Sequence, residues 1–148
     1  MTQNKMDVDI SIQTTIRDGG QRERHTMETN GELIWRGGLL ALQFDEPVEE
    51  GEPQGTSQVM QLRDGRLSVK RKGAVQMDQR FVEGEKTRGM FTSQAGPMQM
   101  ETDTKELQYD WDDMQSRGTI LLVYVLRLAG QKTGTYTMKV TFEEGSDV

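Results

Sequence analysis

The feature that most constrains this chain is a side-chain alternation with a period of two. In Val8–Ile16, apolar residues and threonine occupy every second position, and mostly polar residues fill the positions between them. Such alternation is typical of a β-strand with one buried face, whereas a helix repeats about every 3.6 residues. The last regular stretch, Gly134–Phe142, alternates in the same way. No segment has the spacing of an amphipathic helix, so the sequence predicts an all-β protein.

Short turn signals divide the chain into strands. Gly19-Gly20, Gly37-Gly38 and Asp64-Gly65 are common two-residue hairpin connections. Strands joined by such short connections are antiparallel neighbours, because parallel strands need long crossovers. The predicted strands cover residues 7–16, 22–30, 31–36, 39–45, 56–62, 66–71, 74–82, 86–93, 98–104, 107–111, 118–128 and 134–142.

A meander of this length has to hide its edges, and closure into a barrel does so. The first and last strands alternate most cleanly, so we expect them to pair and to close a single antiparallel barrel of about eight to ten strands. We place one domain over residues 1–148, with an acidic loop at 45–53 and a flexible C-terminal tail at 144–148.

The parity of the alternation changes once, near Lys105. The apolar and hydroxyl side chains are even-numbered up to Thr104 and odd-numbered from Leu107. One extra residue moves the pattern to the other face of a strand, so either a bulge or a corner between two strands explains the change. We predict the corner, with the even face of the first part pointing into the barrel.

Charge and composition exclude several classes of function. The net charge is −6 and the chain has no cysteine. An acidic chain lacks a general affinity for nucleic acid or anionic membranes, and the absence of cysteine suits a reducing compartment. The longest apolar run, Ile120–Leu126, is too short to span a membrane as a helix. These features predict a soluble cytoplasmic protein, and we interpret the basic run Lys70-Arg71-Lys72 as a guard of a strand edge rather than an RNA contact.

Two stretches resemble a known family. "GAVQMDQRFVEG" (Gly73–Gly84) and "MFTSQAGPMQMETDTKEL" (Met90–Leu107) are similar to the YwiB-like family of bacterial domains of unknown function. The resemblance covers nearly the whole chain and implies a calycin-like, lipocalin-style β-barrel, but no particular activity. Gln94 and Ala95 stand where the family has proline and tyrosine, and Asp78 stands where it has a basic residue. A family ligand site that uses that tyrosine would therefore differ here.

No catalytic or metal-binding constellation stands out. His25 is the only histidine, and no serine has the context of a nucleophile elbow. The acidic stretches lack the spacing of a calcium-binding loop. Met98 and Met100 could ligate Cu(I), but the same pair arises whenever methionine fills a barrel interior. We therefore expect no enzyme activity, no metal and no cofactor.

Two interpretations of function lead, and an enzyme that uses an open barrel mouth ranks last, because the sequence has no recognisable nucleophile, metal constellation or cofactor motif. In the first, the barrel interior binds a small apolar or amphipathic molecule. In the second, side chains fill the barrel, which acts as a structural or protein-interaction module, with a homodimer as one form. Arg127 either reaches the barrel rim or faces inward as an anchor for a carboxylate. The candidate residues of the interior site are Phe91, Met98, Met100, Thr102, Thr104, Trp111, Tyr124 and Arg127.

Overall fold

The computed structural model of the chain describes residues 4–48 and 55–145, and these residues contain no helix. The strands are β1 (Asn4–Asp18), β2 (Gln21–Arg36), β3 (Leu39–Asp45), β4 (Thr56–Arg63), β5 (Arg66–Gly73), β6 (Gln76–Val82), β7 (Lys86–Ser93), β8 (Gly96–Asp112), β9 (Arg117–Leu128) and β10 (Gln131–Glu144).

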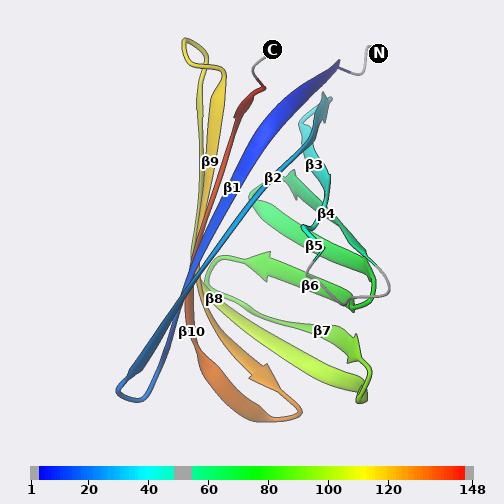
Figure 1. The fold of residues 1–148 in the computed structure, drawn as a ribbon. Helices are drawn as coiled ribbons and strands as arrows, with labels where there is room; N and C mark the ends of the chain where they lie inside the picture. Colours follow the sequence, from blue (N-terminus) through cyan, green and yellow to red (C-terminus); the bar gives the residue numbers. More distant parts are fainter. Residues whose placement is uncertain (1–3, 49–54, 146–148) are drawn as a thin grey trace.

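The strands form one closed antiparallel barrel, which confirms the predicted fold class. Each strand pairs with its neighbours in sequence, and β1 pairs with β10 to close the cylinder (Figure 1). In that closing pair Ile10 lies opposite Phe142 and Ile12 opposite Val140. The alternating faces of the two terminal strands therefore meet, as their patterns predict.

The prediction of two strands in 22–36 was wrong, because these residues form the single strand β2. Gly31, which lies at the expected break, is extended and pairs with Phe44 of β3. A Cβ atom at Gly31 would lie 2.2 Å from the carbonyl oxygen of Gln43. This glycine therefore permits a close approach of two backbones rather than a turn.

The predicted corner near Lys105 was also wrong, and the structure has the alternative, a bulge. Strand β8 is continuous, and its register against β9 shifts between Thr104, opposite Tyr124, and Glu106, opposite Val123. Lys105 is the extra residue. One bulged residue is enough to move the inward set from even to odd positions without ending the strand.

The barrel interior is built from the inward residue of each alternating pair. The side chains with at most 2% exposure include Val8, Ile10, Leu33, Leu42, Met60, Leu67, Phe81, Ile120, Leu122, Val140 and Phe142. Gly118 makes room for the largest of them, since a Cβ atom there would lie 2.3 Å from the ring of Phe142. These side chains form one continuous hydrophobic cluster, and partly buried side chains pack against it.

The predicted acidic loop and C-terminal tail need one adjustment. Glu144 belongs to β10 and pairs with Val8, and the Gly145 N–H donates to the Asp7 carbonyl over 3.0 Å. The tail prediction thus began too early, and residues 146–148 lie outside the described part. Of the predicted acidic loop, residues 49–53 also lie outside it.

Candidate functional site

Four of the eight candidate residues lie in the barrel interior. Met100, Thr102 and Thr104 project inward from β8, and Tyr124 projects inward from β9 opposite Thr104. Their exposed fractions are at most 4%. Because they alternate with outward residues along two paired strands, they share one inner wall.

A small polar cluster lies within this wall. The Gln79 amide of β6 donates to the Thr102 hydroxyl over 3.0 Å, so these two buried polar groups satisfy each other. The Thr104 hydroxyl is fully buried and has no hydrogen-bond partner among the described residues. An unpaired buried hydroxyl costs free energy, and a water molecule or a ligand atom is the usual way to satisfy one.

Aromatic contacts hold Tyr124 in place. Its ring meets Phe81 edge to face, with centroids 4.9 Å apart, and stacks on Tyr136 of β10 at 5.0 Å. Burial raises the pKa of the Tyr124 phenol well above its usual range, and the neighbouring Tyr136 adds to the effect. The phenol therefore stays neutral where an exposed tyrosine would ionise.

This shift predicts alkaline instability. Tyr124 ionises near its ordinary pKa of about 10 when the chain is unfolded, but only at higher pH when it is folded. Above about pH 10 the folded chain holds the proton more tightly, so the stabilisation present below that pH is lost as pH rises. Urea unfolding between about pH 9 and 11.5 should show a steeper loss of stability for the wild type than for Tyr124→Phe. Equal slopes would contradict the assignment.

Phe91, Met98 and Trp111 are half-buried and lie nearer the ends of the barrel. Phe91 lies opposite both Met77 and Met98. Trp111 stacks on Phe142 at 6.3 Å between ring centroids and donates its indole N–H to Asp113 over 2.7 Å. The eight candidates are thus spread along the barrel rather than gathered in one pocket.

Arg127 lies on the outer wall rather than in the interior. The inward residues of β9 are even-numbered, so Arg127 points outward, with 47% of its side chain exposed. Its Nε atom lies 3.9 Å from Glu101 of β8, and both residues line an open hollow of about 570 Å³. Of the two predicted positions, Arg127 therefore does not have the inward one, in which it would anchor a carboxylate.

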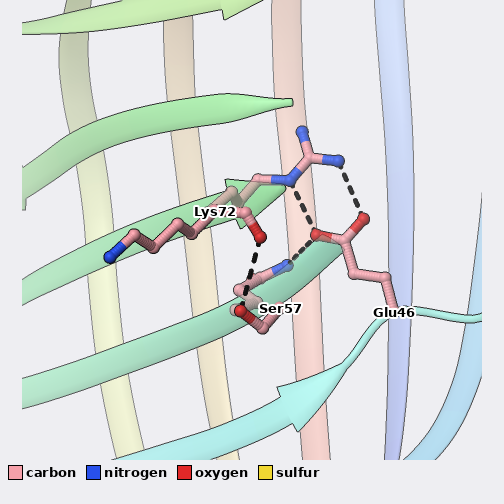
Figure 2. A network of polar contacts seen from close by, with 5 residues as sticks. Glu46, Ser57 and Lys72 are labelled. Atoms are coloured by element: carbon pink, nitrogen blue, oxygen red, sulfur yellow. Dashed lines mark hydrogen bonds and ion pairs between the residues drawn. The ribbon is translucent and has the colours of Figure 1, made fainter. Parts of the chain in front are cut away.

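An inward ion pair lies at the end of the barrel beside the β3–β4 connection. Glu46 accepts hydrogen bonds from Arg71 Nε at 2.7 Å and Nη2 at 2.8 Å, and from the Gln58 amide at 2.9 Å. Figure 2 shows this network, with Ser57 bonded to the Lys72 carbonyl beside it. The side chains of Glu46 and Arg71 are only 10% and 26% exposed.

This ion pair was not predicted from the sequence, because Lys70-Arg71-Lys72 was interpreted as a basic run. The alternation of inward and outward residues along β5 could have predicted that Arg71 points inward. Leu67 and Val69 point inward, and Arg71 has the same parity. Arg71, the middle residue of the run, therefore points into the barrel, whereas Lys70 and Lys72 point outward.

Half of β2 has a free edge. β1 pairs with the whole of β2, down to Asp18 opposite Gln21, but β3 pairs only with Gly31–Arg36. No described residue pairs with the other edge of Gln21–Thr29, and we call this segment the free edge of β2. Asn30 is not included, because it continues the register of the Gly31–Phe44 pair and its outward backbone groups face Asp45 of β3. Figure 1 shows the β1–β2 hairpin extending well beyond β3.

The hairpin geometry says which backbone groups are free. Asp18 and Gln21 flank a two-residue turn, so they form a hydrogen-bonded pair, and the odd residues of this segment bond to β1. The even residues direct their N–H and C=O groups away from β1. Those free residues are Arg22, Arg24, Thr26 and Glu28. All are exposed, and Thr29, at the end of the segment, bonds through its hydroxyl to the Asp45 carbonyl.

The described residues offer neither a metal site nor a membrane-spanning helix. They hold no group of three histidine, cysteine or acidic side chains arranged to bind a metal ion. Among the same residues no helix has the length and hydropathy to cross a membrane.

Comparison with known proteins shows which class of protein this chain resembles. The fold is that of an uncharacterised bacterial β-barrel: the chain is 26% identical over 139 residues to the uncharacterized beta-barrel protein YwiB of Bacillus subtilis, covering 94% of each chain. The crystal structure of that protein superposes with a TM-score of 0.83, over 96% of this chain and 94% of the other. Residues 10–140 match the model of a domain of unknown function, DUF1934, and the chain belongs to that family. The predicted resemblance is thus confirmed.

Proposed function

We propose that this chain is a protein-interaction module in which a filled barrel presents the free edge of β2 to another polypeptide. The observation that carries the proposal is the row of unpaired backbone groups from Arg22 to Glu28. A free strand edge is a template for an added strand, with affinity from the main chain and specificity from side chains.

The packing of the barrel supports this function over an interior ligand. Thr104, Leu122, Val140 and Phe142 have no accessible surface, and they come from three different strands. A guest beside them would have to displace side chains, which costs free energy in an interior packed to normal density. The edge, in contrast, needs no rearrangement to accept a strand.

Peptide selection tests the proposal. Extended peptides of about ten residues, selected on the wild-type chain, should bind it and fail to bind Thr26→Pro, while Thr26→Ala should bind nearly as well. Proline removes the N–H that faces the free edge and leaves the bonds to β1, and an edge strand tolerates its fixed φ. An unchanged circular dichroism spectrum of Thr26→Pro checks that the fold is retained. Peptides that bind Thr26→Pro as tightly as the wild type would contradict the edge as the interaction site.

One observation favours a second candidate, a small apolar or amphipathic ligand in the interior. The Thr104 hydroxyl has no described partner, and it lies beside Tyr124, Thr102 and Met100 on the inner wall. A few polar groups among apolar walls are the usual composition of a ligand pocket. Native mass spectrometry of chain purified from its own cells tests this candidate, since a bound molecule would appear as an added mass.

A pair of substitutions measures the cost of the unpaired hydroxyl. Thr104→Val should raise the free energy of unfolding by up to about 1 kcal/mol, because it removes a buried group without a described partner. Thr102→Val should lower it by about 1–3 kcal/mol, because Gln79 then loses its acceptor. Urea unfolding of both variants checks the pair. A marked loss of stability in Thr104→Val would mean that its hydroxyl is bonded to water or a ligand.

We also propose a cytoplasmic location. The support is the composition: no cysteine that could form a disulfide, and a net charge of −6. Fractionation of cells that produce the chain, with detection by antibody, tests it.

A further inference from the structure

We propose that the partner of the free edge is a second copy of the same chain, paired antiparallel through β2 with His25 opposite His25. This inference rests on the proposed function, because it names the polypeptide that the edge accepts. Two observations carry it. The first is the set of backbone groups that are free, and the second is that the resulting register places side chains of opposite charge across from each other.

The free groups define the register. Hydrogen-bonded positions in an antiparallel pair must be edge-facing on both strands, so even residues must oppose even residues. Among such two-fold registers, one pairs every free residue with a free residue: Arg22 with Glu28, and Arg24 with Thr26. Shifting the strands by two residues in either direction leaves one free residue of each copy without a free partner. The register centred on His25 therefore satisfies the most backbone groups.

The side chains agree with this register. Arg22 of each copy faces Glu28 of the other, so two opposite-charge pairs flank the two-fold axis. The shift that would place Arg24 opposite Arg24 opposes like charges and is disfavoured. The opposite shift places Arg24 opposite Glu28, so charge does not exclude it, but it leaves Arg22 of each copy without a free backbone partner. On the inner face His25 meets His25, and Glu23 meets Met27. Charged side chains normally protect an edge strand from pairing, but here an antiparallel copy places Arg22 opposite Glu28, which has the opposite charge.

The expected dimer is reversible. One shared strand edge buries less surface than a stable interface needs, so we expect a dissociation constant in the micromolar range or weaker. Because a two-fold contact of this kind is closed, association should stop at the dimer.

Disulfide trapping tests the register, since the wild-type chain has no cysteine. Opposed residues at a non-hydrogen-bonded position have Cα atoms about 4.5 Å apart, within the range of a disulfide. His25→Cys should therefore form a covalent dimer in a glutathione redox buffer at high protein concentration. Glu23→Cys is the matched control, because its two introduced thiols would lie about 14 Å apart along the strands. Equal trapping of the two variants, or none in His25→Cys, would overturn the register.

Charge exchange tests the partner by another route. In sedimentation velocity, Arg22→Glu and Glu28→Arg should each weaken the dimer about tenfold, and the double variant should recover most of the affinity. A chain that stays monomeric at millimolar concentration would refute self-pairing. If peptides selected on the wild type still fail to bind Thr26→Pro, the proposed function stands and only the second copy is excluded.

Discussion

Replacing Phe142 with alanine should lower the free energy of unfolding by about 3–5 kcal/mol. Phe142 is fully buried on β10, opposite Ile10 of β1, and its ring stacks on Trp111. The substitution removes a large apolar side chain from the pair of strands that closes the barrel. Since a domain of this size is stable by about 5–15 kcal/mol, the loss is a large fraction of the total.

Urea unfolding followed by circular dichroism measures this effect. Lys139→Ala, an exposed position on the same strand, is the control and should change the stability by less than about 0.5 kcal/mol. A cost below about 1 kcal/mol for Phe142→Ala would mean that the barrel is not packed where β1 and β10 meet.

Replacing Arg71 with methionine should lower the free energy of unfolding by about 2–3 kcal/mol. The largely buried Glu46 carboxylate would keep only the Gln58 amide as a described partner, and a hydrogen bond to a charged group contributes about 1.5–3 kcal/mol. Lys72→Met, which changes an exposed neighbour, should cost little.

A double-mutant cycle separates the pair from its surroundings. The double variant Arg71→Met with Glu46→Gln removes both charges, so its cost should fall below the sum of the two single costs by about 1–2 kcal/mol. Strictly additive costs would show that the network in Figure 2 does not couple the two side chains energetically.

The sequence predicts the strands well because their alternation is local information. The pairing of Val8–Ile16 with Gly134–Phe142 follows from two matching patterns, and the hairpin at Gly37-Gly38 follows from turn chemistry. Gly31 was misinterpreted, because a glycine that allows two backbones to approach looks the same in sequence as one in a turn. The bulge at Lys105 and a strand corner likewise share one signature, the change of parity.

The candidate site is less predictable, because it depends on which strand edges remain unpaired. Alternation correctly places Met100, Thr102, Thr104 and Tyr124 inside. It cannot say how closely these side chains pack against one another, since packing depends on strand lengths and on the width of the barrel. The free edge of β2 arises because β2 is longer than β3, and that difference appears only when 22–30 and 31–36 are joined into one strand.

Amide hydrogen exchange on β2 tests the central claim most directly. At a concentration where the chain is monomeric, the N–H groups of Arg22, Arg24, Thr26 and Glu28 should exchange quickly, while those of Glu23, His25 and Met27 should be protected by β1. At high concentration the even set should gain protection as a partner strand covers it. Protection of both sets at every dilution, or of neither, would contradict an account in which a filled barrel offers one free strand edge.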